Sequence, residues 1–156
     1  MSNRRNFIMS WPELGIAIEC ESLPFNLGIY VWWLDHFPMR AVQSHAAVTG
    51  DLFYTLNVRL PETPPAFPRS DLKIFLMTDV PPGYGIFSYT ESGSLSGGRV
   101  GFVAMHYGPV TEAMDTCPSF KVIDSDMPKL KQAGRAIWNA IYKTKQIITV
   151  ELTVKK

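Results

Sequence analysis

The sequence predicts a mainly β fold with two helices, in which an antiparallel barrel, closed or nearly closed, has a helix at each open end. Three observations predict it. The 156 residues are 46% hydrophobic and 19% charged, which indicates one domain with its own core. About seven or eight short segments alternate between apolar and polar residues, as strands do, and only two other segments have helical periodicity. Strands in series with isolated helices also argue against a doubly wound parallel sheet.

We expect residues 1–12 to be a flexible N-terminal lead and residues 13–156 to be a single barrel domain. The first predicted strand has one apolar face, made of Leu14, Ile16, Ile18 and Cys20. A short helix follows and ends before Pro38, because the residue before a proline avoids the helical region. Trp32 and Trp33 are adjacent in this helix and point about 100° apart, so only one of them can pack into the core.

A hairpin is predicted over residues 40–55, with its turn at residues 49–51, because Gly and Asp accept the backbone angles of tight turns. The hairpin places His45 within a strand. Its neighbours on the same face are small or polar: Ala41, Gln43 and Ala47. Such neighbours leave room above the imidazole, as a pocket does. A hydrogen-bonded structural histidine is the alternative.

The remaining segments complete the barrel. Four prolines between residues 60 and 71 indicate an extended surface loop. Strands are expected at residues 72–77, 84–90, 99–107 and 120–123, with a flexible loop at 91–98. A helix is expected after Asp126, with an apolar face made of Leu130, Ala133, Gly134, Ile137, Trp138 and Ile141. Residues 146–154 form the closing strand.

Charge and cysteine content exclude several functions. The formal net charge is +1 with scattered Lys and Arg, so we expect no nucleic-acid partner. Cys20 and Cys117 are too few for a disulfide framework and are expected to be free thiols. The three histidines lack metal-ligand spacing, so we expect no metal. No apolar run is long enough for a signal peptide or a membrane span, so we expect a cytoplasmic protein with no membrane partner.

The candidate catalytic residues are His45, His106 and Tyr107, because imidazole and phenol groups can transfer protons. His106 and Tyr107 are adjacent in a strand and point to opposite faces, so at most one of them can share a pocket with His45. The candidate substrate-binding residues are mostly aromatic: Trp32, Trp33, Tyr54, Gln43 and Tyr89. The tandem tryptophans could instead form an oligomer interface, so a homodimer is possible.

Several short motifs resemble a family of small, largely uncharacterised cyclophilin-like proteins. They are residues 34–38 (LDHFP), 44–51 (SHAAVTGD), 106–109 (HYGP) and 120–123 (FKVI) with the helix that follows. That family is similar in fold to the catalytic domain of cucumopine synthase, which closes an imine of an amino acid and a keto acid into a ring without a cofactor. The resemblance implies an eight-stranded cyclophilin-like barrel with His45 in its pocket. The proline-rich insertion at 60–71 and the bulky helix at 30–33 depart from the family pattern and leave the substrate open.

We therefore expect a cofactor-independent enzyme that acts on a small organic substrate as a cyclase or isomerase. His45 would be the general acid or base, and Tyr107 or His106 would be a second proton donor. The alternative is a module that binds a small molecule or a peptide without catalysis. The arginine-centred pattern of prolyl isomerases is not found in the sequence, so that activity is not expected.

Overall fold

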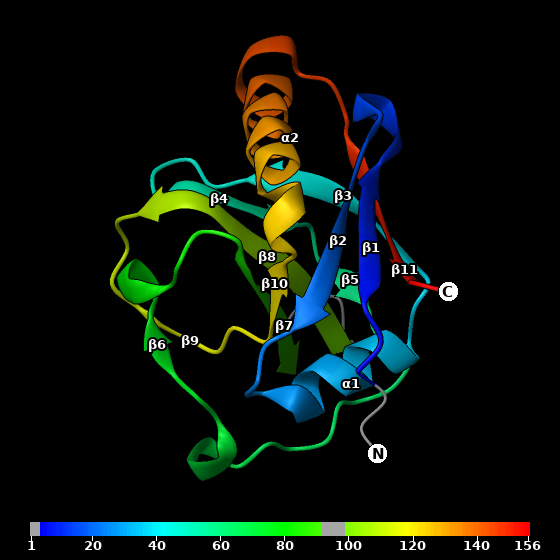
Figure 1. Cartoon of the computed structure of the whole chain (residues 1–156), viewed down its shortest axis with the longest axis vertical. Coiled ribbons are helices and arrows are strands. Elements are labelled where there is room, and N and C mark those ends of the chain that lie inside the picture. Colours follow the sequence, from blue (N-terminus) through cyan, green and yellow to red (C-terminus); the bar gives the residue numbers. More distant parts are fainter. Residues whose placement is uncertain (1–3, 92–98) are drawn as a thin grey trace.

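The computed structural model describes residues 4–91 and 99–156. Within these residues, eight strands form a closed antiparallel barrel in the order β4-β3-β11-β1-β2-β10-β7-β8, and pairing of β8 with β4 closes the ring (Figure 1). The strands are β1 (Phe7–Trp11), β2 (Ile16–Ser22), β3 (Met39–His45), β4 (Gly50–Thr55), β7 (Tyr84–Glu91), β8 (Arg99–Val110), β10 (Phe120–Val122) and β11 (Thr149–Val154). The predicted fold class, mainly β with two helices around a barrel, is confirmed.

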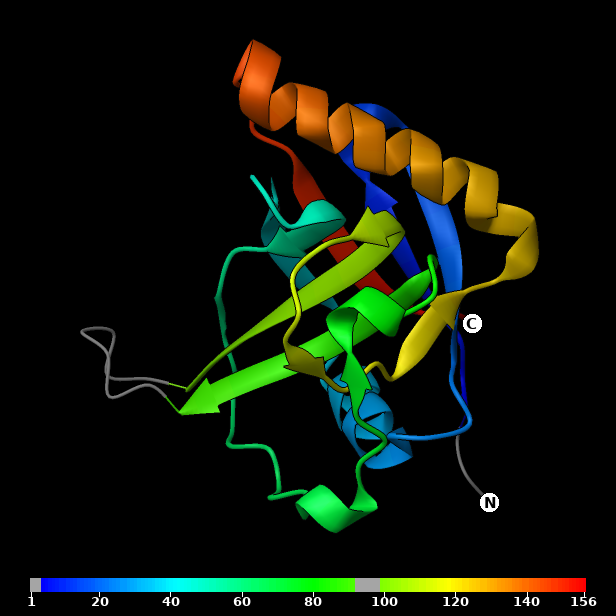
Figure 2. The ribbon, with the colours of Figure 1, turned by 90° about the vertical axis from the view of Figure 1, so that its left-hand side faces the viewer.

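Two α-helices lie toward opposite ends of the described barrel, α1 (Leu27–Asp35) and α2 (Met127–Asn139) (Figure 2). The predicted apolar face of α2 is buried at Leu130, Ala133, Gly134 and Ile137, whereas Trp138 is 38% exposed. Gly134 allows a close approach, because a Cβ atom there would lie 2.5 Å from the ring of Tyr107. The helix continues as a π-helical turn over Ala140–Thr144.

Strand β1 lies in the segment that was predicted to be a flexible lead. Phe7, Met9 and Trp11 alternate along it and are fully buried, and β1 pairs with β2 on one side and with β11 on the other. The Phe7 and Phe120 rings pack edge to face, with their centroids 5.1 Å apart. Only three apolar positions alternate here, beside the polar residues 2–6, so the pattern is too short to indicate a strand by itself.

Other segments differ from the sequence-based expectation in length. The strand expected at 72–77 is only Phe75–Leu76 (β6), and it pairs with Asp115–Thr116 (β9) in a small sheet outside the barrel. Strand β8 continues through Gly108 and Pro109, where it was expected to end, because Val110 still pairs with Gly50 of β4. Short strand β5 (Val58–Arg59) flanks β8. Of the loop expected at 91–98, residues 92–98 lie outside the described residues.

Figure 2 shows the segments after β4 and after β8 on the outside of the barrel, next to β7 and β8. They carry β6, β9 and two 3₁₀ turns, at Arg69–Asp71 and Met77–Asp79. This layer, rather than either helix, covers much of the outer face of β4, β7 and β8. Among the described residues, no helix combines the length and the apolar character needed to cross a membrane.

Candidate functional site

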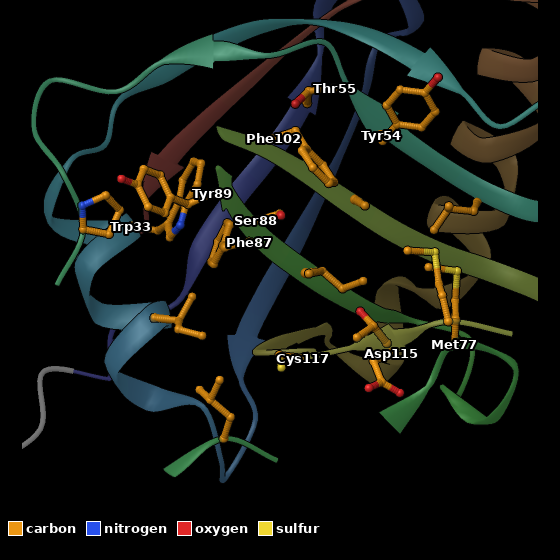
Figure 3. Close-up of a pocket in the computed structure, with 18 of the residues that line it drawn as sticks. Trp33, Tyr54, Thr55, Met77, Phe87, Ser88, Tyr89, Phe102, Asp115 and Cys117 are labelled. Atoms are coloured by element: carbon orange, nitrogen blue, oxygen red, sulfur yellow. The ribbon is translucent and has the colours of Figure 1, made fainter. Parts of the chain in front are cut away.

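A cavity of about 1280 Å³ lies between the outer face of strands β4, β7 and β8 and the layer that covers them (Figure 3). Alternation along the strands explains its floor. Phe102 and Ala104 line the cavity, whereas Val103 and Met105 between and beyond them are buried in the barrel core. Tyr54 lines the cavity from β4 in the same way. We refer to this cavity as the outer pocket.

One end of the outer pocket is aromatic. Trp33 stacks on Phe87, with ring centroids 5.0 Å apart and an interplanar angle of 11°. Trp33 is the tryptophan that packs inward, and Trp32 is half-buried beside it. Both rings line the pocket together with Tyr89, and Figure 3 shows Trp33 and Tyr89 next to each other.

The other end of the outer pocket is polar and lies in the segment after β8. Arg69 donates to Asp115 with 3.0 Å between Nη2 and Oδ2, and the Thr49 hydroxyl donates to Glu112 at 2.9 Å. The half-buried Cys117 lies nearby as a free thiol, and burial raises its pKa. The sequence reasoning missed the pocket residues of this segment, because residues 111–117 have neither periodicity nor a motif. Figure 3 shows Asp115 and Cys117 across the pocket from Tyr54.

His45 and Tyr107 meet inside the barrel. The His45 Nδ1 atom lies 2.7 Å from the carbonyl oxygen of Ala46, and Nε2 lies 2.7 Å from the Tyr107 hydroxyl. A carbonyl oxygen only accepts, so Nδ1 carries the hydrogen and Nε2 accepts from Tyr107. Burial lowers the pKa of His45 and raises that of Tyr107 to about 12, which favours a neutral pair.

This pair does not line the outer pocket. His45 is only 3% exposed and Tyr107 only 5%. The turn after His45 separates them from the cavity, since residues 46–49 form part of the pocket wall. The Tyr142 hydroxyl, from the π-helical turn after α2, donates to the His45 carbonyl oxygen at 2.9 Å and holds the same turn.

Gln43 is also directed into the barrel. Its Oε1 accepts from the Trp11 indole at 2.9 Å, and its Nε2 donates to the Tyr54 carbonyl oxygen at 2.8 Å. Of the residues predicted to bind a substrate, Trp32, Trp33, Tyr54 and Tyr89 therefore line the pocket, and Gln43 does not. The small neighbours of His45 indicated open space, but the rings of Tyr107 from β8 and Tyr142 from the turn after α2 contact the imidazole.

His106 lies on the opposite face of β8 from Tyr107, as alternation predicts. It is fully buried, and neither ring nitrogen has a hydrogen-bond partner in the described part of the chain. Burial alone lowers its pKa to about 4. Among the described residues, no group of three or more His, Cys, Asp or Glu side chains is placed to hold a metal ion.

Comparison with solved structures finds a similar protein, whereas the comparisons with family models and with curated proteins do not. No family model matches the sequence, and no curated protein matches it significantly. The chain is similar to McbB, which was solved in complex with tryptophan, with a TM-score of 0.75 and 26% sequence identity. The match covers 96% of this chain and 44% of the McbB chain. The chain therefore shares nearly its whole fold with a protein that has been seen with a small molecule bound, and spans less than half of that protein.

Proposed function

We propose that this protein is an enzyme that binds a small aromatic molecule in the outer pocket and acts on it by acid–base chemistry, without a resident cofactor. The observation that carries the proposal is the make-up of the pocket, which is aromatic at one end and charged at the other. Face or edge contacts with aromatic rings contribute about 0.5–1.5 kcal/mol each beyond the burial of area. Such a pocket suits a flat ring with a polar tail.

An aromatic amino acid has the groups that this pocket would recognise. Its ring suits the aromatic end of the pocket, near Trp33, Tyr89 and Phe102, and Arg69 is a cation of the lining that could attract its carboxylate. Glu112, whose carboxylate receives a hydrogen bond from Thr49, adds a negative charge to the polar end that suits an amine. The tryptophan in the McbB structure supports this class of ligand, because this chain shares its fold with part of that protein.

The proposed reaction is a ring closure or rearrangement of the cyclase or isomerase type. The resemblance to cyclophilin-like proteins related to cucumopine synthase supports closure of an imine, in which an amine and a keto acid join with loss of water. Glu112 and Asp115 lie in the pocket, so they are the carboxylates with direct access to such a substrate. Catalysis by His45 and Tyr107 would require a ligand to pass the turn at residues 46–49.

The first experiment measures binding and turnover on the same protein. L-tryptophan is titrated by calorimetry into the wild type, into Phe102→Ala and into Trp138→Ala. Phe102 lines the pocket and Trp138 is an exposed ring on α2, so the two variants are matched. We expect Phe102→Ala to weaken binding about tenfold, in line with the loss of one aromatic contact and its buried area, and Trp138→Ala to leave it unchanged.

Mixtures of tryptophan with α-keto acids are then followed by mass spectrometry for a product that has lost water and whose formation needs the protein. Loss of this product in Glu112→Gln or Asp115→Asn, with binding retained, supports the enzyme. Binding without any product supports the alternative, a non-catalytic binding module. Absence of binding by tryptophan and by other aromatic amino acids would refute the proposal.

A further inference from the structure

The outer face of β8 carries Phe102, Ala104 and His106 in one row. The first two line the outer pocket, and the third is completely buried beyond them. Residues two apart on a strand are separated by about 6.5–7 Å. The imidazole of His106 is therefore the next side chain along the floor of the pocket.

The barrier between the pocket and His106 is made of small or flexible apolar side chains. Leu52 lies directly opposite His106 on β4, and it packs in one cluster with Ala104 and Met77. All three of these residues also line the pocket. The backbone nitrogen of Gly83 donates to the His106 carbonyl oxygen at 2.7 Å, which holds the connection before β7 beside this part of β8.

The buried imidazole has unused hydrogen-bonding capacity. A neutral imidazole has one N–H donor and one acceptor nitrogen, and neither nitrogen of His106 has a partner among the described residues. Leaving such a group unpaired in an apolar site destabilises the folded protein, and an apolar residue at this position would avoid that cost. His106 is the next side chain on this face after Ala104, which lines the cavity, so its nitrogens lie close to the space that a bound molecule would fill.

We propose that His106 is a concealed subsite of the outer pocket, which hydrogen-bonds an uncharged polar group of the bound aromatic molecule when the Met77 side chain moves aside. Met77 suits this movement because methionine is unbranched and adapts its shape readily. The group is a hydroxyl or an amide rather than a carboxylate, since the apolar surroundings penalise a charge. The inference rests on the proposed function only in that the pocket takes an aromatic ring, and it requires no reaction.

The test compares indole with hydroxyindoles that differ in the position of the hydroxyl group. One hydrogen bond makes the best hydroxyindole about three- to tenfold tighter than indole in the wild type. In His106→Leu this ratio falls to about one, while the affinity for indole itself stays the same. His106→Gln retains part of the ratio, because an amide can also donate and accept. An indole carboxylate gains nothing over indole at this subsite.

A second measurement uses proton NMR of the hydrogens on the ring carbons of His106. The ring resonances of His106 shift more with the best hydroxyindole than with indole, whose ring current alone moves them. The same ratio of hydroxyindole affinity to indole affinity in the wild type and in His106→Leu would overturn the subsite. In that case the proposed function would still stand if Phe102→Ala weakens the binding of indole. Failure of every indole to bind would count against both proposals.

Discussion

Replacement of His106 by leucine tests how strongly the fold opposes a charge at this position. The pKa of His106 is about 4 in the folded protein and about 6.5 for an ordinary histidine, so the unfolded chain binds the proton more tightly. The contribution of neutral His106 to the free energy of unfolding is therefore fully present above about pH 6.5, and it is lost as the pH falls from 6.5 toward 4. This one residue accounts for a loss of about 2 kcal/mol between pH 7 and pH 5, and about 3 kcal/mol by pH 4.

The assay is urea unfolding of the wild type and His106→Leu at pH 7, 6, 5 and 4. We expect the variant to be at least as stable as the wild type at pH 7, and the difference in its favour to grow by about 2 kcal/mol at pH 5. Acidic groups with lowered pKa values, such as Glu19, contribute to acid unfolding of both proteins and cancel in the comparison. Parallel pH profiles would refute the reasoning, because they would show that His106 is solvated or paired in the folded state.

Two further substitutions test the packing behind the pocket. Tyr107→Phe removes the hydroxyl that donates to His45 Nε2, and we expect a loss of about 1–3 kcal/mol in urea unfolding, with Tyr84→Phe as the control; an unchanged stability would contradict the hydrogen bond. Gly101→Ala would place a Cβ atom 2.7 Å from the Trp33 ring, and we expect a loss of about 1–3 kcal/mol in thermal unfolding with a changed tryptophan emission spectrum. Retention of both properties would show that Trp33 can shift freely.

The sequence predicts the barrel well because the apolar alternation of β2, β8 and β11 survives in the structure. Alternation assigns each side chain to one of two faces, and it correctly separates His106 from Tyr107. It does not say what lies across the barrel from a given face. The space above His45 is filled by Tyr107, and Gln43 is engaged with Trp11. Both contacts join strands that are distant in the sequence.

The outer pocket was only half predictable, for the same physical reason. Its aromatic end contains large rings, which are conspicuous in any sequence. Its polar end depends on the segment after β8, which is aperiodic and is held in place by the short β6–β9 pairing and by the Arg69–Asp115 ion pair. Such contacts arise from the packing of two loops, and no local pattern records them.

The position of β11 has a consequence for how the chain folds. This strand comes last of the eight along the sequence, and it lies between β1 and β3, which come first and third. Until residues 149–154 arrive, β1 and β3 each have an unpaired edge, and the ring of strands cannot close. Pairings between such distant segments give a high contact order, which slows folding, and open edges in the waiting chain favour association with other chains. In the described part of the native chain each of the eight barrel strands is paired on both sides, and the gap between β1 and β3 is the one that is filled last along the sequence.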